Sequence, residues 1–224
     1  MATKGKTEKK REPVKVVQMS ELMDRLADSM AQKEIVRPAV SASYVESIAR
    51  LMIRCGYQFN EKTLTILADY LRGYNLWLCG NVGVGKTFFF DCMTKVRRSQ
   101  GSDSIVKLSM LETQDWTMET AREWVNDTRD RDVLLDDVGT EPVMKSWGQE
   151  AELFPYLLEK RMQLATRRTH LTSNLGIVDI KKRYSERVSD RFVQYFKMEM
   201  FPKAEKSKRV LRPWKPPMDG KGSL

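Results

Sequence analysis

LWLCGNVGVGKTFFF, residues Leu76–Phe90, is the stretch that decides the fold of this 224-residue sequence. An apolar run precedes a glycine-rich octet, Gly80–Thr87, which fits the pattern GxxxxGK followed by Ser or Thr, and further apolar residues follow. Such a loop needs glycine because the backbone must curl tightly enough to point successive N–H groups at a phosphate, in torsions that a Cβ would obstruct. The helix that starts here adds the positive end of its dipole. The octet therefore predicts a strand, a phosphate-binding loop and a helix, in that order.

The last residues of the octet have specific roles in a loop of this kind. We expect Lys86 to reach the β- and γ-phosphates of ATP and the Thr87 hydroxyl to ligate Mg²⁺. At ordinary residue frequencies the pattern arises by chance in about one chain in a hundred, so its context matters. The residues expected to contact the nucleotide are Gly80, Asn81, Val82, Gly83, Val84, Gly85, Lys86, Thr87 and Phe88.

A second apolar run, DVLLDDVG at residues 132–139, supplies that context. It places Asp136 and Asp137 at the end of a strand, where the carboxyl edge of a parallel sheet meets a ligand crevice. We expect Asp136 to be the partner of Mg²⁺ through water and Asp137 to orient the attacking water. The structural alternative is that the two carboxylates cap the next helix.

Composition excludes several classes of protein. With 41% hydrophobic residues, the chain is large enough for one α/β domain with a small appendage. No apolar run approaches the roughly 20 residues of a membrane span, and the N-terminus lacks the apolar stretch of a secretory signal, so we expect a soluble intracellular protein. Three cysteines without CxxC spacing and the single histidine His170 argue against disulfides, zinc sites and most triad hydrolases.

The net charge of +9 lies at the two ends of the chain. Residues 1–17 hold six Lys/Arg and two Glu, and residues 202–224 hold seven Lys/Arg and two acidic residues, so the body between them is neutral. Such ends suit salt-sensitive attraction to phosphate backbones, or they serve only to keep the chain in solution. Both interpretations stay open.

The chain divides into four segments where the composition changes. They are a basic flexible tail at 1–17, a helical partner-binding region at 18–73, an α/β domain at 74–201 and a basic C-terminal tail at 202–224.

Three helices are expected in the second segment. The first is SELMDRLADSMAQKEIV, with Ser20 as its cap. The second, SASYVESIARLMIRCG, opens with a capping box from Ser43 to Glu46 and stops at Gly56. The third spans 61–71, begun by Asn60.

From Tyr74 onward short apolar strands alternate with longer helical stretches, which is typical of a parallel sheet with crossover helices. The expected strands are YNLWLC (74–79), SIVKLSM (104–110), DVLLDDV (132–138), RTHLTSN (168–174) and a short KMEMF (197–201). The expected helices run from 86 to about 98, 113 to about 127, 148 to about 164 and 177 to about 195, the last with a break near Tyr184.

Four motifs, in order, resemble the AAA+ ATPases of the DnaC/IstB group, which comprises bacterial and phage helicase loaders and the ATPase helpers of some transposases. They are LCGNVGVGKT (78–87), VLLDDVGTEP (133–142), LTSN (171–174) and RYSERVSDRF (183–192). The resemblance covers residues 74–201. It implies a P-loop AAA+ three-layer α/β fold with a parallel sheet, a small N-terminal helical region and a minimal or absent C-terminal lid.

The resemblance also assigns residue roles. Asn174 becomes sensor 1, a polar side chain between the metal carboxylates and the γ-phosphate; from the residues alone it would be a helix cap. Arg191 becomes the arginine finger donated to the ATP of a neighbouring subunit, with Arg187 as second candidate. The alternative for both arginines is a surface helix in which Glu186 and Asp190 are their salt-bridge partners. An Asp-Asp pair where many AAA+ proteins carry Asp-Glu implies slow turnover.

The function implied is an ATP-dependent helicase loader that uses ATP and Mg²⁺, forms a homo-oligomer and binds single-stranded DNA and a replicative helicase. The resemblance also implies a location in the bacterial cytoplasm or in the cytoplasm of a phage-infected host. Three alternatives stay open. An IstB-like transposition helper would act on double-stranded DNA with a transposase. A small-molecule kinase would be monomeric and would not need Arg191. A binding module would retain ATP without hydrolysing it.

Overall fold

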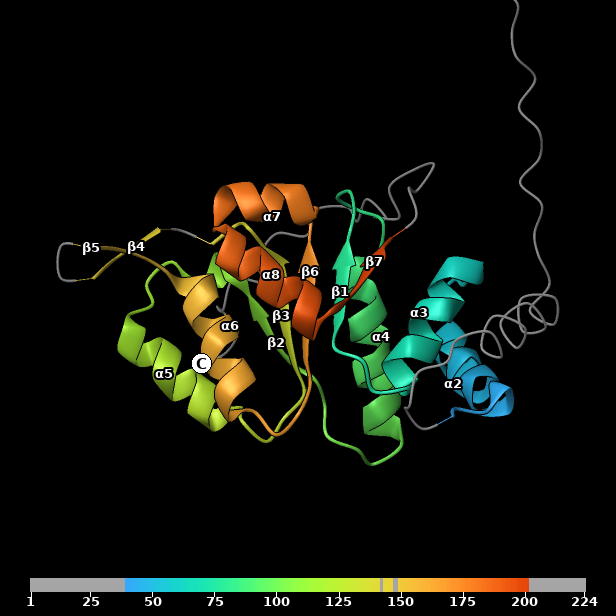
Figure 1. Cartoon of the computed structure of the whole chain (residues 1–224). Coiled ribbons are helices and arrows are strands. Elements are labelled where there is room, and N and C mark those ends of the chain that lie inside the picture. Colours follow the sequence, from blue (N-terminus) through green and yellow to red (C-terminus); the bar gives the residue numbers. More distant parts are fainter. Residues whose placement is uncertain (1–38, 142, 147–148, 202–224) are drawn as a thin grey trace, which may run out of the picture.

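The computed structural model describes residues 39–141, 143–146 and 149–201. The helix expected after Ser20, both basic tails and the segment expected to lack a lid lie outside these residues. Figure 1 shows a central sheet with helices on both of its faces. Within the described part of the chain, no helix is both long and apolar enough to cross a bilayer.

Two helices precede the sheet, α2 (Ala42–Arg54) and α3 (Glu61–Leu71). The capping box predicted at Ser43 is wrong: Ser41 has the extended backbone of an N-cap, and its hydroxyl accepts the N–H of Tyr44 at 3.2 Å. The prediction for α3 is confirmed, since the side chains of Asn60 and Thr63 each accept the other's backbone N–H at 2.9 Å.

All five predicted strands are present and every pairing in the sheet is parallel, in the spatial order β2-β3-β6-β1-β7. The strands are β1 (Leu76–Cys79), β2 (Val106–Ser109), β3 (Val133–Val138), β6 (Thr169–Ser173) and β7 (Lys197–Met200). Because β6 lies between β1 and β3, the carboxyl ends of these three strands meet at one edge of the sheet. The predicted α/β class with a parallel sheet is confirmed.

The predicted crossover helices are present, but two of them begin later than predicted, and a 3₁₀ turn that was not predicted precedes the second. The crossover elements are α4 (Lys86–Ser99), the 3₁₀ turn η1 (Met110–Thr113), α5 (Met118–Asp127), α6 (Leu153–Leu164), α7 (Ile177–Arg183) and α8 (Glu186–Tyr195). Helix α5 begins later than expected, because Thr117 is its N-cap and accepts the N–H of Thr120 at 3.1 Å. The predicted break near Tyr184 is confirmed, since α7 and α8 are separate helices.

The helix expected from Gly148 starts instead at Leu153, because an antiparallel hairpin comes before it. This hairpin consists of β4 (Val143–Ser146) and β5 (Gln149–Glu152). Two short segments separated by two residues, one of them glycine, fit the spacing of a hairpin. The helical periodicity that follows concealed that signal.

Two cores lie on the two faces of the sheet. Figure 1 shows α2, α3 and α4 on one face and α5, α6 and α8 on the other. Strand β1 serves both cores, because Leu76 and Leu78 are buried in the first and Trp77 and Cys79 in the second, as alternation along a strand requires. The helices α2 and α3 therefore share one core with α4 and the sheet.

Candidate nucleotide-binding site

The phosphate loop connects β1 to α4 at the carboxyl edge of the sheet. Its glycines Gly80, Gly83 and Gly85 have φ values of +145°, +81° and +104°. Gly85 is also the N-cap of α4, and it is in the left-handed region, which a side chain would strain. The loop thus ends directly at a helix N-terminus, where free N–H groups and the helix dipole favour a phosphate.

Lys86 is buried at the start of α4, with a residue exposure of 5%. Its ammonium donates hydrogen bonds to the carbonyls of Gly80 and Asn81, at 2.8 and 3.0 Å, and to Oδ1 of Asn174 at 2.8 Å. An ammonium has three protons to donate, and these three neutral oxygens accept them. The contacts hold the Lys86 ammonium at the loop. A charged phosphate oxygen is a stronger acceptor than a carbonyl, so we expect a bound phosphate to attract this ammonium.

Thr87 and Asp136 meet across the crevice between α4 and β3. The Thr87 hydroxyl donates to Asp136 Oδ1 at 2.9 Å, and the hydroxyl of Thr172 on β6 donates to the same oxygen. Burial raises the pKa of the Asp136 carboxyl, hydrogen bonds from Thr172 and Thr87 lower it, and the charge of Asp137 raises it; the net shift is upward. A hydroxyl beside a buried carboxylate is the oxygen donor set that Mg²⁺ prefers, so these residues fit the ion.

Asp137 lies at an irregularity of β3. The register of β3 against β6 shifts between Leu135 and Val138, and Asp137 is the only non-glycine residue of the described chain with a positive φ, +58°. Its N–H donates to the Thr172 hydroxyl at 2.9 Å, which holds this backbone in place. Such a conformation costs about 1–3 kcal/mol and persists mainly where function requires it.

Asn174 follows β6, and its contact with Lys86 brings it into the same crevice. The alternative that Ser173 or Asn174 caps the next helix is wrong, because the N-cap of α7 is Gly176. The Ser173 hydroxyl instead donates to the carbonyl of Val138 at 2.6 Å and accepts the N–H of Leu175 at 3.0 Å. Ser173 therefore fixes the loop that presents Asn174.

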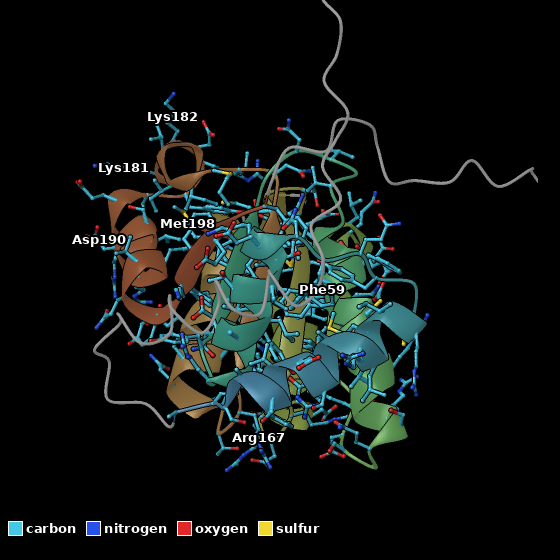
Figure 2. All side chains as sticks on the ribbon, turned by 90° about the vertical axis from the view of Figure 1, so that its right-hand side faces the viewer. Phe59, Arg167, Lys181, Lys182, Asp190 and Met198 are labelled. Carbon is cyan, nitrogen blue, oxygen red and sulfur yellow. The ribbon has the colours of Figure 1, made fainter. Side chains whose placement is uncertain are left out.

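The two candidate arginines lie elsewhere, on α8. Arg191 forms an ion pair with Glu159 of α6 at 3.0 Å, and Arg187 has no ion-pair partner in the described part of the chain. Figure 1 places α8 and α4 on opposite faces of the sheet, and Asp190 of α8 is at the outer side of the molecule in Figure 2. The structure brings Lys86, Thr87, Asp136, Asp137 and Asn174 together, and it does not bring the arginines to them.

Two residues at this edge, Thr172 and Glu141, had no role predicted from the sequence. Thr172 holds both aspartates, as described above. Glu141 is buried beyond β3 and contacts Tyr184 in the break between α7 and α8. A polar residue inside an apolar strand was the available signal for Thr172. The contact between Glu141 and Tyr184 had no local signal, because it joins residues 43 positions apart.

The two tryptophans of the α5 region are packed against the second core, where Trp116 and Trp124 have ring centroids 6.0 Å apart. Over the same described residues, the three cysteines are free and no group of three or more His, Cys, Asp or Glu side chains gathers into a metal site.

A cavity of about 660 Å³ lies at the opposite, amino edge of the sheet. Its lining includes Arg97, Asp132, Arg167 and Arg168, and Figure 2 shows Arg167 at the lower edge, with Lys181 and Lys182 of α7 at the upper one. Arg97 and Arg168 both pair with the buried Asp132. The cavity is separate from the nucleotide site, because it lies at the amino edge of the sheet and the phosphate loop lies at the carboxyl edge.

The fold and the site are those of a P-loop α/β domain: a five-stranded parallel sheet, a phosphate loop after its β1 strand and an acidic pair two strands away on β3. No family model matches the chain, and no curated protein matches it.

Three solved structures are similar to this chain in fold. A protein from Streptococcus pyogenes serotype M3, proposed to be a primosome component, matches with a TM-score of 0.46 and 16% identity over 84% of this chain and 100% of its own. AMPPCP-bound DnaA from Aquifex aeolicus matches with a TM-score of 0.49 and 20% identity over 65% of this chain and 48% of its own. The DnaC helicase loader matches with a TM-score of 0.43 and 17% identity over 80% of this chain and 99% of its own. These likenesses concern the fold alone.

Proposed function

We propose that this protein is a Mg²⁺-dependent ATPase of the helicase-loader type, which assembles through ATP at subunit interfaces and acts in the cytoplasm on single-stranded DNA and a replicative helicase. One observation carries the ATPase part. Lys86, Thr87, Asp136 and Asn174 come from three separate segments and form contacts of 2.8–2.9 Å at the carboxyl edge of the sheet. A merely structural glycine turn with a solvated lysine would not bury the ammonium beside the Asn174 amide, with the neighbouring Thr87 hydroxyl on the Asp136 carboxylate.

The residues present fit a nucleotide with its metal. The loop N–H groups and Lys86 would hold the phosphates, and Thr87 and Asp136 would hold Mg²⁺, which supplies charge neutralisation at the β- and γ-oxygens. In this scheme Asp137 would orient the attacking water, and Asn174 would contact the γ-phosphate. Because Asp137 has a shorter side chain than glutamate, we expect slow turnover.

An arginine supplied by another subunit completes this scheme. Arg187 and Arg191 are on α8, across the sheet from the helix that begins at the phosphate loop. An arginine there suits the ATP of a neighbour better than its own. In assembly Arg191 would exchange its ion pair with Glu159 for phosphate oxygens, which accept a guanidinium in the same two-pronged geometry.

The loader role rests on the sequence motifs, which resemble the DnaC/IstB group in order and spacing. The alternative is the transposition helper of the same group. It has the same nucleotide site and differs in the DNA it prefers, so a DNA-binding measurement separates the two.

ATP hydrolysis measured over a range of protein concentrations tests the site and the assembly together. We expect the activity per subunit to rise with concentration and to be lost in Lys86→Ala, Asp137→Asn and Arg191→Ala. Lys95→Ala, an exposed lysine of the same helix, should retain it. Glu159→Ala is the matched control for Arg191, because it breaks the ion pair and keeps the arginine. If Glu159→Ala is as inactive as Arg191→Ala, the trans role of Arg191 is wrong.

Fluorescence anisotropy with labelled single- and double-stranded oligonucleotides of equal length, with and without ATP and Mg²⁺ over a salt series, tests the loader role. ATP-dependent preference for single strands, lost in Lys86→Ala and Arg191→Ala, supports it. Preference for duplex favours the transposition helper. Binding that is independent of ATP and disappears when residues 1–17 and 202–224 are removed contradicts both.

A further inference from the structure

Glu141 is buried beyond the carboxyl end of β3, with an exposure of 4%. Both oxygens of its carboxylate accept hydrogen bonds: Oε2 from the N–H of Gly139 at 2.8 Å, and Oε1 from the hydroxyl of Tyr184. A buried carboxylate that lost such donors would be costly, so these contacts constrain the residues that make them.

The two donors belong to different parts of the molecule. Gly139 is two residues beyond Asp137, in the segment that carries the acidic pair. Tyr184 lies in the break between α7 and α8. Glu141 therefore connects the end of β3, the strand of the acidic pair, to the start of α8, the helix of the two candidate arginines.

Arg183 strengthens the same connection. Its guanidinium donates to the carbonyl of Glu141 at 2.9 Å and lies 3.6 Å from Oε1 of the same residue. The ring of Tyr184 packs against Phe154 with centroids 5.2 Å apart, which limits its movement. Burial, followed by the charge of Glu141, raises the pKa of Tyr184, so its hydroxyl remains a proton donor at every physiological pH.

The arginines are close to this anchor in the chain. Ser185, next to Tyr184, is the N-cap of α8 and accepts the N–H of Val188 at 3.2 Å. Arg187 is in the first turn of that helix, and Arg191 is one turn further. Because Glu141 holds Tyr184 in place, it also holds the N-terminus of α8, the helix on which both arginines lie.

We infer that Glu141 is a positioning residue: through Gly139 and Tyr184 it links the ATP site of its own subunit to the arginines that this subunit donates to its neighbour. The inference rests on the proposed function, because it assumes an arginine acting in trans. Movement of the acidic pair passes along the backbone to Gly139 and through the Glu141 carboxylate to α8. Glu141 itself touches neither nucleotide nor metal in this scheme.

Two inactive variants make a test possible. A Lys86→Ala subunit has no functional ATP site but still donates its arginines, whereas an Arg187→Ala/Arg191→Ala subunit has the site and donates none. When the two are mixed, some interfaces contain both working parts, so ATPase activity should reappear. Tyr184→Phe is then introduced only into the Lys86→Ala subunit, where the local ATP site is already inactive.

We expect Tyr184→Phe in the donor subunit to lower the restored activity about tenfold, the size expected when a hydrogen bond to a charged group is lost. Tyr195→Phe in the same donor is the matched control, because it removes a half-exposed hydroxyl at the far end of α8, and it should change nothing. Glu141→Ala in the donor should act like Tyr184→Phe. Glu141→Gln, which still accepts the Gly139 N–H, should be less harmful. Full restoration with the Tyr184→Phe donor overturns the inference.

Hydrogen–deuterium exchange of single, unmixed chains separates this inference from the proposed function. On addition of a non-hydrolysable ATP analogue with Mg²⁺, exchange of the amides of residues 186–191 should change in the wild type and stay constant in Tyr184→Phe. An unchanged exchange in the wild type, with analogue bound, overturns the inference. Absence of restored activity in the parental mixture contradicts only the trans arginine, and absence of analogue binding contradicts the ATPase itself.

Discussion

Lys86 Nζ and Asn174 Oδ1 are 2.8 Å apart, so the two residues expected to contact the γ-phosphate of ATP are hydrogen-bonded to each other. They are 88 positions apart in the chain, and the parallel pairing of β1 with β6 brings them together. The contact shows that the Asn174 amide reaches the phosphate end of the loop. A phosphate oxygen placed there would take the Lys86 proton that Asn174 now accepts.

Asn174→Ala should therefore lower the rate of ATP hydrolysis much more than the affinity for ATP. Loss of one donor to developing charge costs about 10²-fold in kcat, while the other loop contacts preserve binding within a few-fold. Steady-state ATPase assays combined with calorimetric titration of an ATP analogue measure both quantities. Asn126→Ala, at an exposed position of α5, is the control. Equal losses in affinity and rate would instead make Asn174 a simple binding residue.

Thr87→Val should remove the dependence of nucleotide binding on Mg²⁺. Valine has nearly the shape of threonine, but it cannot ligate the ion or donate to Asp136, where the present contact is 2.9 Å. We expect affinity measured with Mg²⁺ to fall about tenfold or more, and affinity measured with EDTA to be unchanged. Thr94→Val on the same helix is the matched control. A variant that still responds to Mg²⁺ would assign the ion to other ligands.

The single histidine should make the folded state less stable in mild acid. Burial, followed by the charge of Arg168, lowers the pKa of His170 to about 3, and the charge of Asp132 acts in the opposite direction. Its Nδ1 accepts the N–H of Leu76 at 3.2 Å, so the ring is neutral in the fold. The unfolded chain takes up a proton below about pH 6.5 and the folded chain does not, so stability falls as pH decreases from there toward 3.

Between pH 7 and pH 5 this difference amounts to about 2 kcal/mol of unfolding free energy. His170→Asn keeps an oxygen acceptor for Leu76 and cannot titrate, so its urea unfolding curves should lack that dependence. The carboxylates are the same in both proteins, and the comparison therefore isolates His170. Equal pH dependence in the two proteins would mean that the buried ring can be protonated without cost.

Gly139→Ala should destabilise the loop after β3 more than Gly101→Ala destabilises a surface turn. Both glycines have a positive φ, +101° and +71°, so both substitutions strain the backbone. A Cβ on Gly139 would lie 2.5 Å from Cδ1 of Leu175, whereas nothing lies within 4 Å of one on Gly101. We expect the difference in unfolding free energy to be about 1 kcal/mol, measured by urea denaturation. Equal losses would mean that Leu175 moves aside freely.

Local sequence rules predicted much of the fold. The glycine octet, the five apolar runs and the Asn60 cap each depend on torsions and burial of neighbouring residues, and each was found at its predicted place. The errors were also local. Ser41 was overlooked in favour of Ser43, and the hairpin before Leu153 was taken for helix, because several polar residues in succession offer competing caps and turns.

The chemistry of the site is partly of this local kind. The roles of Lys86, Thr87 and Asp136 could be predicted from the sequence, because each residue has a fixed place in a short local motif, either the phosphate loop or the acidic end of a strand. The role of the Thr172 hydroxyl, which donates to Asp136 and accepts from the N–H of Asp137, could not be predicted, because a polar residue inside an apolar strand does not indicate which partners it will meet.

The sequence alone predicts a phosphate loop, a parallel α/β sheet and an acidic strand end. It does so because backbone torsion, helix capping and apolar periodicity depend on a few neighbouring residues. Tertiary packing alone puts β6 between β1 and β3, pairs Arg191 with Glu159 and closes Glu141 onto Tyr184. These contacts join segments that are distant in the sequence, so local rules do not predict them, and a polar group that becomes buried, such as the Glu141 carboxylate, must find its partners in the folded chain.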